Sequence, residues 1–449
     1  MGKLIKLRRG KDIKLEGETS LEIAPAQSIR NYAIKPTDFL GIVPKLMVKP
    51  GDEVKAGTPL FHSKKNPEIL FCSPVSGEIA DVIRGDRRLV LEVRILADPE
   101  NKYESFPKDN PDSMDRVQVI ERLKQSGCWP FIRQRPFNII ADPQDEPKSI
   151  FISCFDSAPL APDYNFILKE NAGEFQTGLN ALAKLTPGKV YLGLRKGANN
   201  GDAFTKAKGV EIFEMDGPHP AGNVGVQIHH MDPINKGDVV WVINPQDVAI
   251  IGRLFLEGRF RNEKIIALAG SEIKNRKYHR TFSGASVESL VQNNISETKN
   301  RFISGNVLTG SRIETTGYLG FYDNVLTVIP EGDHYEFMGW LIPSYPRPSV
   351  SKTFLYYLTP NRKFKVNTNF HGEERAFVMS GEYDKVLPMD VLPVQLLKAI
   401  LAGDFDNMES LGIYEVVEED LALCEFVCTS KINVQEILRE GLDLVQREG

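Results

Sequence analysis

The sequence predicts a multidomain α/β protein, and three observations support this. The chain has 449 residues, more than one hydrophobic core normally serves. Its first part alternates short apolar runs with glycine and proline, whereas its middle alternates continuous apolar runs with helical stretches. Apolar residues at helical spacing return near the end. We therefore expect four domains: residues 1–100, 101–258, 259–335, and 336–449, the last including a connecting segment.

The composition limits the classes of function. A net charge of −5 argues against broad nucleic-acid binding, which needs an excess of Lys and Arg. Five dispersed cysteines, at positions 72, 128, 154, 424 and 428, predict a reducing, cytoplasmic compartment.

Two further features concern membranes. The basic stretch MGKLIKLRRGKDIKL, residues 1–15, has no apolar run after it, so we expect no secretory signal. The most apolar window, residues 239–256, is interrupted by Asn244, Pro245, Asp247 and Arg253 and is too polar to cross a bilayer. Any membrane role is then expected to be peripheral, through a partner.

The first domain is predicted from two segments, MVKPGDEVKAGTPLF (47–61) and SPVSGEI (73–79). Gly51, Gly57 and Gly77 supply turn conformations that side chains would strain. The pattern resembles the barrel-sandwich domains that carry biotin or lipoate.

In such carriers the hairpin between the two segments presents one lysine for modification. Here the hairpin is HSKKNPEILFC, and Lys64 and Lys65 lie between Ser63 and Asn66 rather than in a Met-Lys-Met or Asp-Lys-Ala context. We therefore expect solvated lysines on the carrier fold without carrier chemistry. A modified lysine is the alternative.

The second domain is predicted to be Rossmann-like. A helix is expected to begin at Ser113 and to stop at Gly127, and another to run from Gln246 to Gly258. Strands are expected at 137–141, 149–154, 189–194, 210–215 and 239–244, with helical stretches such as 164–185 between them. No GxGxxG motif occurs, and KGANNG (196–201) fits an ordinary left-handed turn better than a nucleotide loop.

The last two domains follow from shorter patterns. Strands at IIALAG (265–270), RFISGNV (301–307) and NVLTVIP (324–330), with a short helix at 286–291, have the content of a β-grasp, SLBB-like unit. Apolar residues at 391, 392, 396, 397, 400 and 401 predict an amphipathic helix that ends at Gly403. Helices at 418–428 and 433–447 complete a helical domain.

Cys424 and Cys428 have the spacing of the last two ligands in a C-x2-C-x2-C-x3-C-P run. The two preceding ligand positions hold Glu418 and Leu421, so the pair is vestigial as a cluster site. Buried core thiols, two ligands of a site shared with another chain, and a redox pair remain open.

Histidines offer a second candidate for metal binding. His219, His229, His230 and Asp232 are close in sequence. We expect His229 and His230 to lie on a strand, where neighbouring side chains point to opposite faces and do not converge on one ion.

The loop MDGPHPAGNVG (215–225) contains two prolines around His219 and three glycines. It follows a predicted strand of the Rossmann-like sheet, at the edge where ligands approach such sheets. Gly217, Pro218, His219 and Pro220 therefore form either a rigid ligand-proximal loop or a domain-packing turn.

A series of motifs spans nearly the whole chain: KPGDEVKAGTPLF, SPVSGEI, GPHPAGNVG, INPQDVAIIGRLF, IIALAGSEIK, ISGNVLTG, GYLGFYDNVLTVIPEG and EEDLALCEFVC. In this order they resemble the A subunits of the bacterial Na⁺-translocating NADH:quinone reductase. The resemblance implies a peripheral subunit on the cytoplasmic face of the inner membrane. Its partners would be the other, especially membrane, subunits, which pass electrons from NADH through flavins and an iron–sulfur centre to quinone.

The family is also similar to the flavin-bearing subunit of respiratory complex I and to the Rnf complex C subunit, which use a glycine-rich GxGGAGFP loop. Here SGCWPFIRQRP (126–136) takes its place, and we expect Cys128, Trp129 and Phe131 to exclude a flavin by their bulk. Likewise SCFDSAPLAPD (153–163) has Phe155 and Ser157 where those relatives have two glutamates.

We therefore expect a docking subunit that binds no cofactor itself and is not catalytic alone. As quinone-proximal residues we expect Gly217, Pro218, His219 and Pro220, with Trp340 as a weaker candidate. The alternative is a flavin- or NADH-binding electron-transfer subunit like the Rnf relative.

Overall fold

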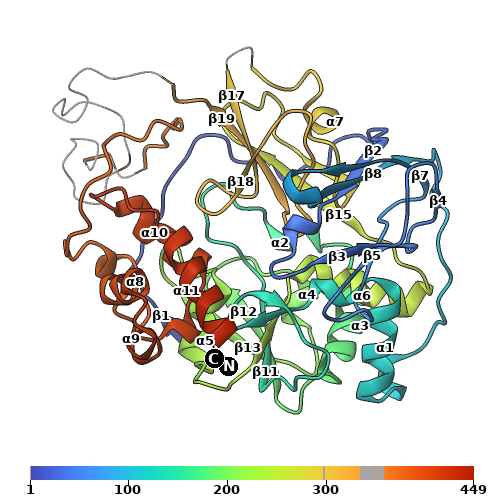
Figure 1. Cartoon of the computed structure of the whole chain (residues 1–449), viewed down its shortest axis with the longest axis horizontal. Coiled ribbons are helices and arrows are strands. Elements are labelled where there is room, and N and C mark those ends of the chain that lie inside the picture. Colours follow the sequence, from blue (N-terminus) through green and yellow to red (C-terminus); the bar gives the residue numbers. More distant parts are fainter. Residues whose placement is uncertain (1, 297–298, 334–347, 349–357, 360, 449) are drawn as a thin grey trace.

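The computed structural model describes residues 2–296, 299–333, 348, 358–359 and 361–448. Figure 1 shows the strands of residues 31–97 and the C-terminal helices on opposite sides of a central α/β region. The described residues form four sheets, which hold seven, five, four and three strands. The predicted multidomain α/β class is confirmed.

The N-terminal barrel-sandwich is built from two antiparallel sheets. One contains β2 (Asn31–Ile34), β8 (Val90–Ala97), β7 (Gly77–Arg84) and β4 (Glu53–Val54), and the other β3 (Pro44–Leu46), β5 (Pro59–Ser63) and β6 (Leu70–Cys72). Phe61 and Phe71 stack in the core with ring centroids 4.6 Å apart. Gly77 is required at the start of β7, because a Cβ there would lie 2.0 Å from the carbonyl oxygen of Leu96.

The seven-stranded sheet has the order β1 (Leu4–Lys6), β13 (Glu211–Asp216), β12 (Lys189–Arg195), β11 (Ser149–Ser153), β14 (Val240–Val242), β9 (Arg133–Arg135) and β10 (Ile139–Ile140). The strands from β1 to β14 are parallel, and β9 pairs antiparallel to β14. Two details differ from the sequence prediction. The first strand, β1, joins this sheet and not the barrel, and β10 forms an antiparallel edge with β9 rather than a parallel strand.

Six helices accompany this sheet in the described chain: α1 (Arg116–Ser126), α2 (Tyr164–Ile167), α3 (Ala172–Ala183), α4 (Asp202–Thr205), α5 (Val224–Met231) and α6 (Pro245–Glu257). The predicted stop at Gly127 is confirmed, whereas the N-cap is Asp115, in a capping box with Gln118, and not Ser113. Helices α3 and α6 pack closely because Gly178 and Gly252 leave room for backbone; a Cβ on Gly252 would lie 1.8 Å from the Glu174 carbonyl oxygen.

The third unit is a five-stranded mixed sheet. Its order is β16 (Tyr278–Phe282), β15 (Glu263–Ala269), β19 (Val325–Pro330), β17 (Asn300–Ser304) and β18 (Ser311–Ile313), accompanied by α7 (Val287–Val291). Strands β15, β17 and β19 and helix α7 were predicted. The hydroxyl of Ser286 caps α7 by accepting a hydrogen bond from the amide of Ser289.

The C-terminal unit contains α8 (Pro393–Ala402), α9 (Phe405–Ser410), α10 (Glu418–Val427) and α11 (Val434–Glu448). Helix α8 ends at Gly403, which adopts a left-handed conformation as predicted. Buried Arg135 of β9 joins this unit to the seven-stranded sheet through Glu419 at 2.5 Å and Asp420 at 3.4 Å. Among the described residues, we find no helix long and apolar enough to span a bilayer.

Candidate functional site

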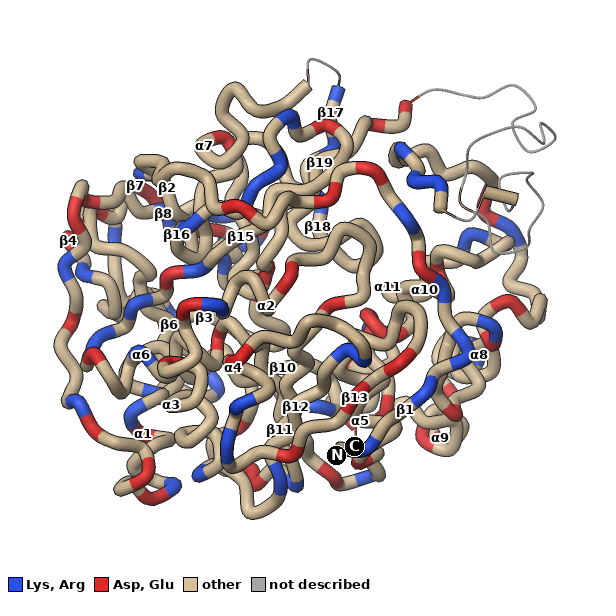
Figure 2. Tube along the Cα trace, turned by 180° about the vertical axis from the view of Figure 1, so that it is seen from behind, with Lys and Arg blue, Asp and Glu red and all other residues tan. Residues whose placement is uncertain are grey.

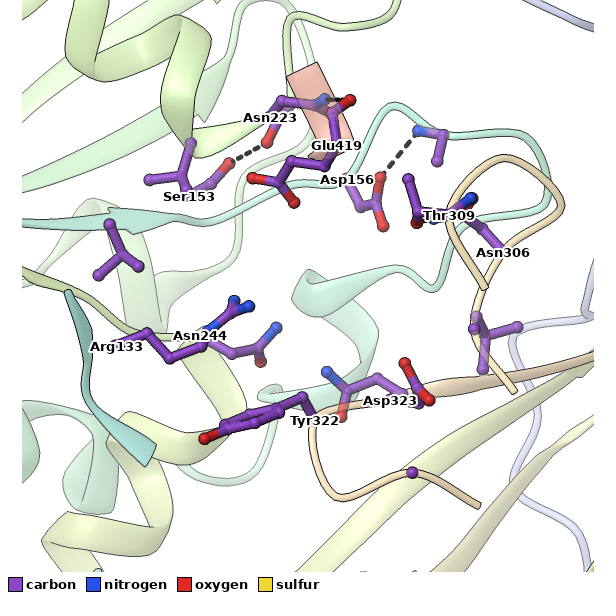
Figure 3. A pocket seen from close by; sticks show the side chains of 18 of the residues that line it. Arg133, Ser153, Asp156, Asn223, Asn244, Asn306, Thr309, Tyr322, Asp323 and Glu419 are labelled. Carbon is purple, nitrogen blue, oxygen red and sulfur yellow. Dashed lines mark hydrogen bonds between the residues drawn. The ribbon is translucent and has the colours of Figure 1, made fainter. Parts of the chain in front are cut away.

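A cavity of about 580 Å³ lies where the carboxyl ends of β11 and β14 meet the third unit and the C-terminal helices. Ser153 closes β11 there, and Ile243 and Asn244 follow β14. Ligands of open parallel sheets bind at this kind of edge. Figure 3 shows Arg133, Asn244 and Tyr322 facing Asp156 and Glu419 across the space.

The polar lining comes from every unit of the fold, including the barrel side through Thr37 and Asp38. Amide and hydroxyl side chains predominate: Asn138, Ser153, Asn223, Asn244, Asn306, Thr309, Ser311, Asn324 and Gln435. Such a lining can hydrogen-bond a polar ligand from several sides.

The ionisable lining is strongly acidic. Five carboxyl groups, those of Asp38, Asp156, Asp323, Glu418 and Glu419, line the cavity. Within the described residues Arg133 is the one Lys or Arg in the lining. Its guanidinium lies 5.0 Å from the ring centroid of Tyr322 and donates to Asn138 at 3.3 Å. The lining therefore offers an anionic ligand few cationic partners.

Three of these carboxyl groups form ion pairs with cationic side chains outside the lining. Glu419 pairs with Arg135, and Glu418 pairs with Arg439 at 3.1 Å. Asp38 lies 3.3 Å from the ammonium of Lys35, yet burial raises its pKa to about 6.

Asp156 differs because its partners are backbone amides. Its carboxylate accepts a hydrogen bond from the amide of Ala158 at 2.8 Å. The pKa of Asp156 is raised to about 6, chiefly by burial; the backbone hydrogen bonds oppose this shift, and nearby Glu419 adds to it. The charge of Asp156 therefore changes within reach of neutral pH.

The loop after β13 brings His219 to the same cavity. Segment 10–12 holds the loop in place: Lys11 donates its amide to the His219 carbonyl oxygen at 2.8 Å, and the His219 amide donates to Asp12 at 2.9 Å. Gly217 has a φ of +152°, and a Cβ there would lie 2.8 Å from the Cβ of Leu7. The loop is thus fixed by tertiary packing.

The imidazole of His219 is neutral at physiological pH. Its Nδ1 lies 2.9 Å from the hydroxyl oxygen of Ser157, which also accepts a hydrogen bond from the amide of Gly222. Burial lowers the pKa of His219 to about 4, although Asp12 opposes this shift. The neutral ring can therefore form hydrogen bonds, but it is not protonated to imidazolium at physiological pH and is a poor general acid.

The residues expected to exclude a flavin by bulk lie in the core beside the cavity. Cys128, Trp129 and Phe131 are fully buried and do not line the cavity. The indole of Trp129 donates to the Ala141 carbonyl oxygen, and the ring of Phe131 stacks on Phe321 with centroids 5.0 Å apart. They fill the core, and the cavity beside them stays open.

The segment 153–163 is brought to the cavity, whereas the C-terminal cysteines are not. Cys424 and Cys428 are both buried. The thiol of Cys428 accepts hydrogen bonds from the Tyr383 hydroxyl at 3.0 Å and from the Ile432 amide at 3.3 Å. Burial raises the pKa of Cys424, which keeps it a thiol rather than the thiolate that a metal needs. Of the three alternatives, buried core thiols fit these surroundings.

The two neighbouring histidines lie on helix α5, so the prediction of a strand there was wrong. His229 pairs with Glu415 at 2.7 Å and accepts from the amide of Asp390, and His230 lies 2.9 Å from the Pro388 carbonyl oxygen. Both rings are used to hold the segment before α8 and the turn before α10. No group of three or more potential metal ligands gathers within the described part of the chain.

Three other candidates lie away from the cavity. Lys64 and Lys65 are exposed after β5, as predicted. Gly197 in KGANNG adopts a left-handed turn with a φ of +71°, also as predicted. Trp340 lies outside the described residues.

Sequence reasoning found His219 but missed Asp156, Glu419 and Arg133. A signal existed for Asp156, because it follows the end of a continuous apolar strand, where site residues of parallel sheets gather. For Glu419 and Arg133 the sequence contains no comparable signal, since β9 and α10 meet the cavity only through tertiary packing.

Family models match three consecutive stretches of the chain. The model described as "NqrA N-terminal barrel-sandwich hybrid domain" matches residues 5–98, "NqrA second alpha/beta domain" matches 114–260, and "NQRA C-terminal domain" matches 265–315. A solved NAD⁺-reducing [NiFe]-hydrogenase matches at 11% identity with a TM-score of 0.41. The match covers 76% of this chain and 63% of that chain, and this similarity is too weak to indicate a shared function.

Curated relatives match at full length. The A subunit of the Na(+)-translocating NADH-quinone reductase of Neisseria meningitidis serogroup B (strain ATCC BAA-335 / MC58) is 38% identical over 450 residues, which cover 99% of this chain and 100% of that protein. The corresponding proteins of Haemophilus influenzae (strain PittGG) and Yersinia pestis bv. Antiqua (strain Angola) are each 37% identical with the same coverage. This chain therefore belongs to the family of A subunits of the Na⁺-translocating NADH-quinone reductase.

Proposed function

We propose that this chain is a peripheral docking subunit on the cytoplasmic face of a Na⁺-pumping NADH:quinone oxidoreductase and binds no flavin, NADH or iron–sulfur centre itself. Its partners are the other subunits, including the membrane subunits. The observation that carries the cofactor-free part is the charge of the cavity lining: it includes five carboxyl groups and, among the described residues, one guanidinium, and Asp156 and Asp323 form no ion pair with a described cation. Flavin nucleotides and NADH both bring phosphate groups, which such a lining repels.

Two of the helix N-termini at the cavity support the same conclusion. Phosphates commonly bind at a helix N-terminus, where free amides and the helix dipole favour negative charge. At α10 the first turn already contains Glu418, Glu419 and Asp420. At α6 the side chain of Asn244 caps the helix by accepting from the Gln246 amide. These two helix ends thus fit a phosphate group poorly, whereas the N-terminus of α5 has no side-chain cap.

A quinone head group is uncharged and meets no such repulsion. The loop Gly217, Pro218, His219 and Pro220 is the part of the chain that we propose to lie near quinone. Neutral His219 would hydrogen-bond a quinone oxygen; its low pKa disfavours a role as acid. Trp340, a weaker candidate, lies outside the described residues.

The purified chain tests the cofactor-free part. An absorption spectrum and an intact mass should show neither isoalloxazine absorbance nor added mass. A preparation with about one flavin per chain, or with stoichiometric iron, would overturn it.

The assembled complex tests the quinone part. A photoreactive quinone analogue should label peptides that contain residues 217–220, and His219→Ala should reduce this labelling while Lys64→Ala leaves it unchanged. Labelling confined to other subunits would overturn the quinone part and leave the docking role in place.

A flavin- or NADH-binding electron-transfer subunit is the second candidate. One observation favours it: a cavity of about 580 Å³ stays open where parallel sheets bind nucleotides. Equilibrium dialysis of the purified chain against flavin mononucleotide and against NADH distinguishes the two candidates. Saturable binding at micromolar ligand supports the second, and no binding at millimolar ligand supports the first.

A further inference from the structure

Charge is unevenly distributed along the chain. Residues 1–14, MGKLIKLRRGKDIK, contain six Lys or Arg residues and one Asp, which gives a net charge of +5. The whole chain contains 55 Lys or Arg and 60 Asp or Glu residues, so the remainder holds 49 and 59 and carries −10. Such an asymmetry in an acidic protein indicates a local contact with an anionic partner.

The six cations form one extended surface feature, which we call the basic ribbon: Lys3, Lys6, Arg8, Arg9, Lys11 and Lys14. It begins in β1, the edge strand of the seven-stranded sheet. Ile5, Leu7 and Ile13 are buried between these cations and anchor the ribbon. Figure 2 shows Lys and Arg positions following β1 and the chain beyond it.

The middle of the ribbon forms no ion pair with a described carboxylate. Lys6, Arg8 and Arg9 are exposed, and Asp216, which lies opposite Lys6 in the β1–β13 pairing, pairs with Lys196 instead. The nearby carboxylate of Asp12 accepts the amide of His219 instead. At the two ends the ammonium of Lys3 donates to the His230 carbonyl oxygen, and that of Lys14 donates to Asn361.

The chemistry of the ribbon favours a bilayer surface over a protein partner. Protein interfaces depend on buried aromatic or aliphatic anchors, and the exposed residues of the ribbon offer only Leu4 besides the cations. Lysines along an edge strand also oppose the addition of a further strand. Anionic headgroups need neither anchors nor strand pairing, since each nearby Lys or Arg adds an independent attraction.

We propose that the basic ribbon lies against the anionic phospholipid headgroups of the membrane that holds the complex. The proposal rests on the proposed peripheral location of the chain but not on the cavity or on quinone. Vesicles that contain no quinone, cofactor or other protein test it, so its failure would leave the docking role intact.

Co-sedimentation of the full-length chain with vesicles tests the proposal. We expect binding to vesicles of phosphatidylcholine and phosphatidylglycerol at 7:3, release at high NaCl, and no binding to pure phosphatidylcholine. The triple variant Lys6→Gln/Arg8→Gln/Arg9→Gln should lower the partition coefficient by on the order of 100-fold, because each cation contributes roughly fivefold.

A matched variant removes the same charge from the barrel. Lys45, Lys64 and Lys65 are exposed, and Lys45→Gln/Lys64→Gln/Lys65→Gln should bind vesicles within about twofold of the unmodified chain. Unchanged circular dichroism and melting would show that both variants fold. Equal losses for both variants, or no binding to the anionic vesicles, would overturn the proposal. Release of the ribbon variant from detergent-solubilised complex, without any vesicle effect, would overturn it in favour of an acidic protein partner.

Discussion

Segment 126–136 has two sides that meet opposite environments. Cys128, Trp129 and Phe131 are packed into the dry core, where the rings of Trp129 and Phe131 contact Trp241 and Phe321. Two residues on, Arg133 faces a polar cavity lined by carboxyl groups. Bulk in this segment thus builds the core, whereas charge lines the cavity. Under the proposed function, the cavity side selects the ligand by electrostatics.

The core side extends to a buried ion pair. Lys264 lies 3.0 Å from Asp247, and both side chains are 1% exposed. The ammonium also lies 5.6 Å from the ring centroids of Phe131 and Phe321 and donates to the Phe321 carbonyl oxygen at 2.8 Å. On the cavity side three of the acids depend on cations: Glu419 on Arg135, Glu418 on Arg439, and Asp38 on Lys35. The two sides should respond differently to mutation and to pH.

Trp129→Ala should give the largest loss of stability, because it leaves a cavity in the core where the indole was packed. We expect a loss of about 3–5 kcal/mol in the free energy of unfolding, as for other large-to-small changes at fully buried aromatic residues. Urea unfolding followed by circular dichroism measures this, and Trp129→Phe should lose less. The variant should gain no flavin. Stoichiometric flavin in Trp129→Ala would show that bulk does control the cavity and would break the comparison.

The next effect concerns Asp420, a fully buried acid that adjoins the cavity side through Arg135. Burial raises the pKa of Asp420 to about 7, although Arg135 opposes the shift. In the unfolded chain the carboxyl group loses its proton near pH 4, so between pH 4 and 7 the folded state holds more protons. Stability contributed by this group is therefore present at low pH and falls as pH rises toward 7.

Asp420→Asn should remove this dependence. The difference in unfolding free energy between the variant and the unmodified chain should grow by at least about 1 kcal/mol from pH 4 to pH 7. Asn can still accept the Val417 amide, which bonds Asp420 at 3.0 Å. Urea unfolding at four pH values in this range measures the difference. Parallel curves for the two proteins would show that Asp420 is ionised throughout, held by Arg135.

Much of the fold could be predicted because it depends on local sequence. Gly127 and Gly403 end helices in left-handed conformations, and the apolar runs of β11 and β12 form buried parallel strands. The pairing of β1 with β13 was missed, since three residues near position 5 carry no signal for a partner some 200 positions away. Helix α5 was missed because two adjacent histidines resemble a short polar strand as well as the end of a helix.

The site was predictable only in part, because contacts between segments far apart in the sequence leave no local signal. The prolines and glycines around His219 predict a rigid loop after a strand, and the loop does line the cavity. Its surroundings are set by contacts between distant segments, such as Asp12 with the His219 amide and Ser157 with the ring. The acidity of the cavity also arises from several units and cannot be inferred from any one of them.

A smaller loss of stability is expected for a change at Ser157, which contacts the loop around His219. Ser157→Ala leaves the Gly222 amide and the His219 Nδ1 without their shared partner, which should cost about 1–3 kcal/mol of unfolding free energy. Ser410→Ala, at an exposed position, should change it by less than about 0.5 kcal/mol. Thermal or urea unfolding of both variants provides the measurement, and equal effects would contradict the role given to Ser157.

The titration of His219 sharpens this prediction. Because burial lowers its pKa to about 4, the imidazole C2 proton signal of the unmodified chain should not move between pH 8 and pH 5.5. The sign of the stability effect is opposite to that of Asp420: the unfolded chain binds more protons between pH 4 and 6.5, so this group adds stability as pH rises. A signal that titrates near pH 6.5 would show that the loop opens in solution.

The smallest effect is expected at the barrel hairpin, which is neither core nor cavity. Lys64 and Lys65 are exposed after β5, and no ion pair with a described carboxylate involves them. Lys64→Ala/Lys65→Ala should therefore change the unfolding free energy by less than about 0.5 kcal/mol. Intact mass should equal that of the unmodified polypeptide before the substitution and should fall only by the side-chain difference after it. A larger mass that disappears in the variant would mean that the barrel still serves as a carrier. The hairpin lysines would then be a site of covalent modification. The carboxyl groups of the cavity have a different proposed role, which is to disfavour anionic ligands.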